Sequence, residues 1–209
     1  MPSRASTSSK TYDSEATRKR IFEAAVAEFS QYGIAGARVD RIAAQAKSNK
    51  QLIYSYFGNK EALFAAVLQE KLEQLAAAIN LEPDRVPEYV GELFDFHAAN
   101  PETLRLVMWE GLHYGDQPVP NELARTEHYL HKAATIAEGQ RQGFIDDALQ
   151  ARHIAFMLLA LTGWWFAVPP IARMLLGGDA DSKAVMAEYR AQIVEAARRI
   201  VQNKPAQKQ

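Results

Sequence analysis

Apolar residues recur at intervals of three and four along almost the whole chain. In residues 14–32 they form a stripe made of Ile21, Phe22, Ala25, Val26 and Phe29. Such spacing gives an α-helix one apolar face, whereas a half-buried strand is apolar at every second residue. No sustained run of alternating β-branched residues occurs. The pattern therefore predicts an all-α fold.

Glycine, proline and capping residues divide the 209 residues into separate predicted helices. Ser14 is the expected N-cap of the first helix, Gly33 its end, and Asn49 the cap of the third. The predicted helices cover residues 14–32, 39–46, 50–57, a long segment after Gly58-Asn59, 88–99, 101–114, 121–143, 147–168 and 182–201.

The net charge of −1 hides an asymmetry along the chain. Residues 1–60 contain ten Lys/Arg and five Asp/Glu, a net charge of +5, whereas residues 61–209 contain fourteen and twenty, a net charge of −6. A basic N-terminal quarter indicates a polyanionic partner for that part. The 48% hydrophobic content excludes wholesale disorder, and the absence of cysteine excludes disulfides, thiolate metal sites and a cysteine nucleophile.

Residues 154–172 carry no charged side chain and could suggest a membrane span. Pro169-Pro170 interrupts them, so at most about 15 residues, or roughly 22 Å, form a continuous helix. A hydrocarbon core is about 30 Å thick. A buried or subunit-interface helix is therefore the preferred interpretation, with membrane association as an alternative. The first residues show no apolar signal segment, so we expect a cytoplasmic protein with no membrane partner.

Residues 39–57 have the dimensions of a helix-turn-helix, with two short amphipathic helices joined by about four residues. A helix of this size fits the major groove of DNA, which is roughly 12 Å wide. The second short helix begins with Asn49, Lys50 and Gln51, and Ser55 follows one turn later. These side chains could reach base edges, and basic residues surround them.

The residues that we expect to face DNA are basic, polar or aromatic: Arg18, Arg38, Arg41, Lys47, Asn49, Lys50, Gln51, Tyr54, Ser55, Tyr56 and Lys60. The residues alone leave an alternative open, namely an ordinary three-helix cluster with a solvated basic face.

The sequence of this region resembles the signature of the tetracycline-repressor (TetR-type) family. The matching runs are Val39-Asp40-Arg41-Ile42-Ala43 and Leu52-Ile53-Tyr54-Ser55-Tyr56-Phe57-Gly58-Asn59-Lys60-Glu61-Ala62-Leu63, preceded by Arg20-Ile21, Ala24-Ala25, Phe29 and Gly33. The resemblance covers residues 14 to about 68. It implies that Lys50 and Gln51 face bases, that Tyr54 and Tyr56 lie against the DNA backbone, and that Lys60 meets a phosphate at a helix N-terminus.

Two positions depart from the family pattern. Lys47 stands where the turn usually has glycine, so we expect a positive φ there at a cost of roughly 1–2 kcal/mol. Ala37-Arg38 replaces the usual hydroxyl cap, which leaves the start of the second helix without a local capping side chain.

The resemblance divides the chain into a flexible basic arm (residues 1–13), a helix-turn-helix domain (14–60) and a helical effector-binding and dimerisation domain (61–205). Ligand candidates are aromatic or polar residues of central helices: Phe94, His97, Met108, Trp109, His113, Tyr114, Trp165 and Phe166. Candidates for a homodimer interface lie on the last two predicted helices: Met157, Leu161, Trp164, Tyr189, Ile193, Ala196, Ala197 and Ile200. Aromatic residues at helical spacing belong to the core more often than to a pocket, so a core role is the alternative for each aromatic candidate.

No enzyme constellation is evident in the sequence. Glu110 and His113 have the spacing of a helical metal-ligand pair, but the motif occurs once and a di-iron site needs it twice. His128 and His131 lack an evident third ligand nearby. We therefore expect no enzyme activity, no metal and no cofactor.

These observations predict a homodimeric DNA-binding transcriptional regulator, a repressor released from a palindromic operator by a small-molecule effector. The mostly apolar ligand candidates favour an apolar or aromatic effector. The alternative is a helical small-molecule-binding protein without operator-specific DNA binding.

Overall fold

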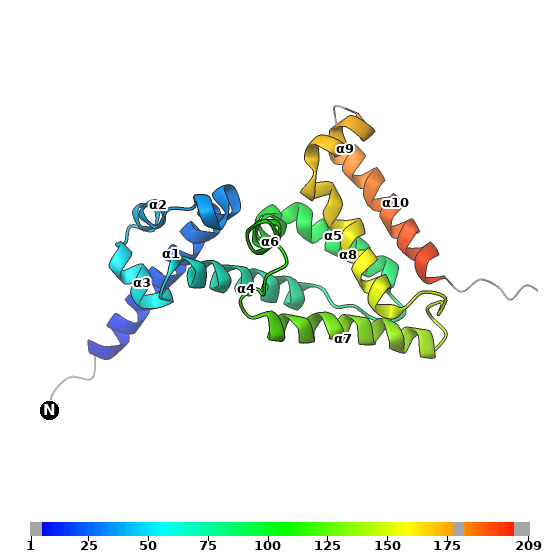
Figure 1. Cartoon of the computed structure of the whole chain (residues 1–209), viewed down its shortest axis with the longest axis horizontal. Coiled ribbons are helices and arrows are strands. Elements are labelled where there is room, and N and C mark those ends of the chain that lie inside the picture. Colours follow the sequence, from blue (N-terminus) through cyan, green and yellow to red (C-terminus); the bar gives the residue numbers. More distant parts are fainter. Residues whose placement is uncertain (1–5, 178–181, 203–209) are drawn as a thin grey trace, which may run out of the picture. The chain divides into compact units, whose positions relative to one another are not determined.

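The computed structural model describes residues 6–177 and 182–202, and every regular element within those ranges is a helix (Figure 1). This confirms the all-α prediction. The helices are α1 (Ser6–Gly36), α2 (Val39–Gln45), α3 (Lys50–Phe57), α4 (Lys60–Ala78), α5 (Val86–Ala99), α6 (Pro101–Tyr114), α7 (Glu122–Arg141), α8 (Ala151–Ala167), α9 (Pro169–Leu176) and α10 (Lys183–Val201).

The contacts between residues divide the chain into two compact units. The first unit takes in the chain up to Leu72 together with Arg105–Pro120, and the second contains Glu73–Leu104 and the chain from Asn121 onward. The first unit thus includes much of α4 and most of α6 besides the helix-turn-helix of residues 14–60. A segment far along the sequence therefore helps to build the N-terminal core.

The core of the first unit lies where α1, α2, α3 and α4 meet. Its fully buried side chains include Ile21, Phe29, Ile42, Ile53 and Phe64, and Leu106 of α6 joins the same cluster. The rings of Phe29 and Phe64 meet edge to face, with centroids 5.2 Å apart. Burial of these side chains explains the helical spacing of the apolar residues in this part of the sequence.

In the second unit, α5 packs against both α8 and α10, and α7 packs against α8 (Figure 1). The side chains buried between these helices include Val90, Leu93, Phe94, Ile136, Ile154 and Leu158. Ser182 caps α10 by accepting a hydrogen bond from the Val185 amide at 3.3 Å.

Several helix boundaries differ from the sequence-based prediction; α8, for example, begins at Ala151 rather than at residue 147. The first helix begins at Ser6 rather than at an N-cap on Ser14, because no glycine or proline precedes Gly33 after Ser6 to interrupt it. Gly33 does break the helix as predicted, with φ 67°. Pro169-Pro170 ends α8 as expected but also starts the unpredicted helix α9, since proline fits the first helical turn.

Within the described residues, no single helix is long and apolar enough to cross a bilayer. Only α8 and α9 taken together reach that length and composition, and they are bent by 86° at the break between them.

Candidate nucleic-acid interface

The start of α3 presents a row of polar side chains to solvent. The Asn49 side chain caps the helix by accepting a hydrogen bond from the Leu52 amide at 2.8 Å. Ile53 is the buried residue of α3, whereas Lys50 and Gln51 are exposed. Tyr54 and Ser55 are exposed as well. The helix therefore shows hydrogen-bonding groups on its outer face while one isoleucine anchors it to the core.

The turn between α2 and α3 passes through Lys47, whose φ is 50°. This confirms the left-handed conformation that the sequence predicts for Lys47. The amides of Lys47 and Ser48 bond back to the carbonyls of Ala44 and Ala43, at 3.2 and 2.9 Å. These bonds fix the turn tightly and leave the Lys47 side chain exposed.

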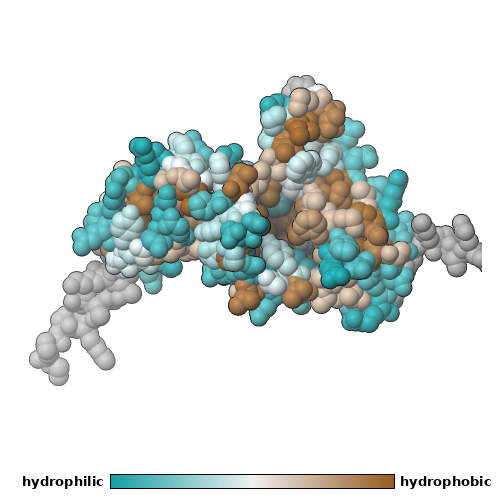
Figure 2. Space-filling model, in the orientation of Figure 1, coloured by the Kyte–Doolittle hydropathy of each residue, from teal (hydrophilic) through white to brown (hydrophobic). Residues whose placement is uncertain are grey.

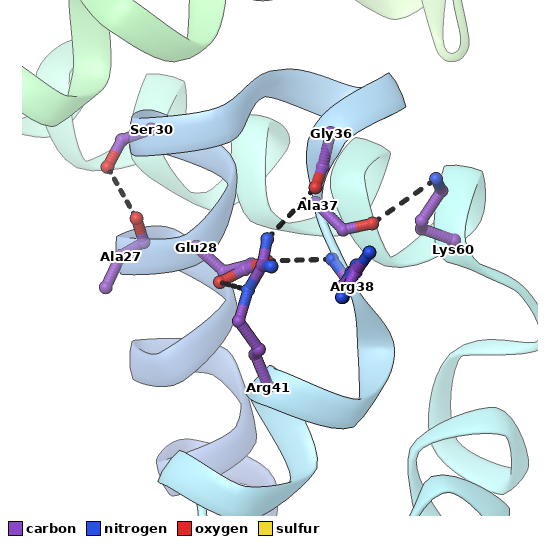
Figure 3. A network of polar contacts seen from close by, with 8 residues as sticks. All are labelled: Ala27, Glu28, Ser30, Gly36, Ala37, Arg38, Arg41 and Lys60. Atoms are coloured by element: carbon purple, nitrogen blue, oxygen red, sulfur yellow. Dashed lines mark hydrogen bonds and ion pairs between the residues drawn. The ribbon is translucent and has the colours of Figure 1, made fainter.

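The buried carboxylate of Glu28, on α1, holds the start of α2 (Figure 3). Its Oε1 atom accepts a hydrogen bond from the backbone amide of Arg38, the N-cap residue of α2, at 2.7 Å. In a capping box, a glutamate three residues into the helix makes this contact. Glu28 makes it from ten positions upstream, so tertiary packing replaces the missing local cap.

Arg41 of α2 is the second partner of Glu28. Its Nε donates to both carboxylate oxygens at 2.8 and 3.1 Å, and its Nη2 lies 2.6 Å from Oε1 and donates to the carbonyl of Gly36 at 3.0 Å. The guanidinium also lies over the ring of Tyr32. Hydrogen bonding to Glu28 raises the pKa of Arg41. Arg41 was expected to face DNA, and in the structure its donors are bonded to Glu28 and to the Gly36 carbonyl.

Two further contacts connect the helices around α3. The hydroxyls of Tyr56 and Ser14 are 2.9 Å apart, which ties α3 to α1. Arg20 Nε donates to the carbonyl of Ala46 at the end of α2 at 3.3 Å. Tyr56 is half-buried and its hydroxyl contacts Ser14, whereas Tyr54 is exposed.

Lys60, at the first position of α4, is half-buried and its Nζ donates to the carbonyl of Ala37 at 3.5 Å (Figure 3). The contact joins α4 to the segment that precedes α2.

The basic residues around α3 differ in whether another side chain of the protein already contacts them. Within the described part of the chain, Arg38 and Lys47 form no ion pair, and both are exposed. Arg18 lies over the ring of Phe57, with its guanidinium carbon 5.7 Å from the ring centroid. Lys50 instead pairs with Asp40 of α2, Nζ to Oδ1 2.7 Å, and this hydrogen bond raises the pKa of Lys50.

A part of α6 closes the other side of the first unit. The Nε atoms of Arg105 and Trp109 both donate to the carbonyl of Ser30, at 2.8 and 3.1 Å. The Trp109 ring lies directly on Gly33, where a Cβ would come within 2.6 Å of it. Gly33 is thus required both by its backbone angle and by the contact with Trp109.

Four of the eight ligand candidates come together in the second unit. Phe94 contacts Trp165 and Phe166, with ring centroids 6.3 and 5.1 Å apart, and His97 lies 6.1 Å from Phe166. Tyr189, which was placed only among the interface candidates, joins the same aromatic cluster at 4.6 Å from Trp165. Spacing on one helix cannot reveal this neighbour, because it belongs to α10.

His97 is buried in this cluster and its Nδ1 has no hydrogen-bond partner among the described residues. Burial away from water lowers the pKa of His97 to about 4. The imidazole is therefore neutral near pH 7.

The other four ligand candidates lie on the α6 segment of the first unit. Trp109 donates a hydrogen bond to the Ser30 carbonyl of α1, and Tyr114 packs against the core of the first unit. Met108 is half-buried and His113 is exposed. All four belong to the first unit, whereas the aromatic cluster belongs to the second.

The interface candidates divide by burial. Ile193 and Ala197 are 3% and 0% exposed and belong to the core of the second unit. Trp164 is exposed, and the remaining five are half-buried: Met157, Leu161, Tyr189, Ala196 and Ile200. The spacing of apolar residues along the sequence shows that a helix is apolar on several faces. It does not show which of these faces packs into the core.

Large apolar side chains are exposed on α8 and α9. They include Phe156 and Trp164, at 74% and 59%, and Met174 and Leu175. Figure 2 shows the apolar surface over α9 at the top of the view.

A separate cavity of about 360 Å³ in the second unit is lined by none of the ligand candidates; Pro83, Asp84, Val86, Pro87, Phe144, Arg198, Val201 and Gln202 line it. Among the described residues, no three His, Asp or Glu side chains are grouped so that they could hold a metal ion.

Family models match both parts of the chain. Residues 21–67 match the model described as bacterial regulatory proteins of the tetR family, and residues 85–199 match the tetracyclin repressor-like C-terminal domain. The HTH-type transcriptional repressor SCO4008 of Streptomyces coelicolor is 50% identical over 190 residues, which cover 90% of this chain and 97% of that protein.

Solved structures of transcriptional regulators are also similar to this chain. The putative transcriptional regulator SCO4942 from Streptomyces coelicolor is 34% identical, with a TM-score of 0.77 over 90% of this chain and 99% of that one. AibR, solved with isovaleryl coenzyme A and operator DNA, is 15% identical and shares the fold, with a TM-score of 0.66 over 87% of this chain and 97% of that one. The relatives are transcriptional regulators rather than enzymes.

Proposed function

Because this chain belongs to the tetR family of bacterial regulatory proteins, we propose that it is a homodimeric repressor that leaves a palindromic operator when a small-molecule effector binds. The observation that carries the proposal is the exposed polar start of α3, held at a fixed angle by the Asn49 cap and by Ile53. A rigid helix with outward Lys50 and Gln51 is suited to the major groove. Operator binding places the protein in the cytoplasm, where a bacterial chromosome lies.

The roles of the exposed residues follow from their chemistry. Lys50 and Gln51 read base edges, while Tyr54 and Lys47 contact the DNA backbone. Arg18, Arg38, Asn49, Ser55, Tyr56 and Lys60 lie around this surface and support its register on the duplex. Arg41 acts indirectly, by holding α2 against Glu28.

The direct test is selection of DNA from a randomised pool by the full chain. We expect an enriched palindrome, with Gln51→Ala changing the preferred sequence and Tyr54→Ala weakening binding to all sequences alike. Absence of any enriched sequence would contradict operator binding and favour a small-molecule-binding protein without that activity.

A second copy of the chain is the partner that a palindrome requires, since two recognition helices must reach major grooves about 34 Å apart. The exposed Phe156 and Trp164 of α8 support an interface there. On α10 the exposed Ala187 and Ala191 are small enough to allow close approach of a partner helix.

The aromatic cluster around Phe94, His97, Trp165 and Phe166 supports an apolar or aromatic effector. Its buried imidazole is neutral and offers one unpartnered nitrogen, so a ligand there gains a hydrogen bond without burying a charge. By linkage, effector and operator weaken each other by the same factor, typically about 5- to 150-fold. Titration of the protein bound to the enriched duplex with candidate compounds measures this factor. A compound that binds the second unit but leaves the affinity for the duplex unchanged is not an inducer.

A further inference from the structure

The ion pair between Asp40 and Lys50 joins the two helices of the helix-turn-helix on its exposed side. Asp40 is the second residue of α2 and Lys50 the first of α3, and Nζ lies 2.7 Å from Oδ1. The two side chains are 71% and 47% exposed. A pair as exposed as this contributes little to folding stability. The pair lies at the start of α3, the helix that is proposed above to enter the major groove.

The pair changes what Lys50 can do. A free lysine is a flexible point charge that any phosphate attracts. Paired with a carboxylate, its charge is largely neutralised at a distance, and its four-carbon stem is held in one direction. The ammonium has three N–H donors, of which Asp40 takes one. Two donors remain for acceptors that lie in the right place.

We propose that Asp40 is a specificity-determining residue, which orients Lys50 toward guanine O6 and N7 in the major groove and suppresses its attraction to phosphates. Guanine presents these two acceptors side by side, and lysine contacts to them are among the commonest specific contacts. Asp40 itself touches no base. Glu28 contributes indirectly, because it fixes the start of α2 through the Arg38 amide. The inference rests on the proposed operator binding.

The test uses the full chain, the duplex that the wild type enriches from a randomised pool, and a scrambled duplex of the same composition. We expect Asp40→Asn to bind the scrambled duplex more tightly, with a salt dependence steeper by about one unit of log K against log salt. The ratio of affinities for the enriched and scrambled duplexes should fall roughly 5- to 10-fold, the size of one weakened base contact. Asparagine retains the size of the side chain, and the exposed position leaves the fold intact.

Glu23→Gln is the matched control, because Glu23 also pairs with a lysine, Lys19, at 3.9 Å on the exposed side of α1. It removes the same charge from the same unit but lies on α1, outside α2 and α3, so the affinity ratio should not change. In a Lys50→Met background, Asp40→Asn should no longer change the ratio, because the residue that it orients is gone.

An unchanged ratio in Asp40→Asn, an equal fall in Glu23→Gln, or a fall that persists in the Lys50→Met background would each overturn the role of Asp40. Failure of the wild type to enrich any sequence would overturn the proposed function, and the inference with it. The two failures are therefore distinguishable.

Discussion

Lys47 adopts a left-handed backbone conformation that an L-amino acid with a side chain takes only at a cost. Glycine would make the same turn without strain. The lysine places a positive charge on the exposed side of the turn, next to the start of α3. At this position glycine would favour folding stability, whereas lysine supplies a positive charge for DNA binding.

Lys47→Gly should raise the free energy of unfolding by about 0.5–1 kcal/mol, since relief of the positive φ outweighs the added freedom of glycine in the unfolded chain. The same change should weaken DNA binding and make it less dependent on salt. Urea denaturation and binding titrations measure the two effects. Lys47→Gln removes the charge and keeps the strain, so equal stability of the two variants would refute the strain.

His97 makes stability depend on pH. Its folded-state pKa of about 4 lies below the ordinary value near 6.5, so the unfolded chain binds a proton that the folded chain does not. The free energy of unfolding should therefore fall, by roughly 2–3 kcal/mol in total, as the pH drops from about 6.5 to about 4. Burial and a neighbouring lysine also lower the pKa of His128, so wild type and variant must be compared.

His97→Gln should flatten this pH dependence in denaturation experiments between pH 4 and 7. The exposed His153 provides the control, and His153→Gln should retain the wild-type slope. A slope in His97→Gln identical to that of the wild type would show that His97 is not responsible.

At the scale of elements, the start of α2 and the kink in α1 are both held by partners that are distant in sequence. Glu28 supplies the capping contact of α2, and Trp109 and Arg105 donate hydrogen bonds to the Ser30 carbonyl before the kink at Gly33. Helix ends leave backbone groups without intrahelical partners, so such contacts fix where a helix begins and ends.

Glu28→Ala should lower the free energy of unfolding by about 1–3 kcal/mol, because it leaves the Arg38 amide without its acceptor. Glu28→Gln keeps an acceptor but loses the charge opposite Arg41, so it should cost less than the alanine variant. Affinity for all DNA sequences should fall in the same order. Glu23 is an exposed acid on the same helix. If Glu23→Gln lost as much stability as Glu28→Ala, this role of Glu28 would be contradicted.

Gly33→Ala should cost about 2–4 kcal/mol of unfolding free energy, because it adds a side chain at φ 67° and places its Cβ 2.6 Å from Trp109. Gly36→Ala is the matched control. Its Cβ would lie 3.4 Å from that of Tyr32, an ordinary contact, so a change within about 0.5 kcal/mol is expected. Chemical denaturation of both variants decides the point, and similar stabilities would mean that the kink tolerates a side chain.

At the scale of the whole molecule, each unit has its own core, and each carries one part of the proposed function. The first unit presents α3 to DNA, and the second contains the aromatic cluster and the exposed apolar side chains of α8 and α9. An exposed tryptophan and phenylalanine on one helix support contact with a second copy.

Trp164→Glu should convert the proposed dimer to a monomer, since a carboxylate replaces an apolar side chain that is 59% exposed in the single chain. Analytical ultracentrifugation measures the change, and operator affinity should fall with it. Leu112→Glu alters an apolar residue of α6 that is 74% exposed and should remain dimeric. A dimeric Trp164→Glu variant would move the interface away from this face of α8.

The sequence by itself determined the helical fold, the approximate bounds of α2 and α3, and the Asn49 cap. These depend on periodicity and turn chemistry, which act within a few residues. Only the tertiary structure decided that Glu28 engages Arg41, that Ile193 and Ala197 face the core, and that part of α6 completes the first unit. These outcomes depend on atoms far apart in sequence, as in the Trp109 to Ser30 bond across 79 positions, and no local pattern encodes such a meeting.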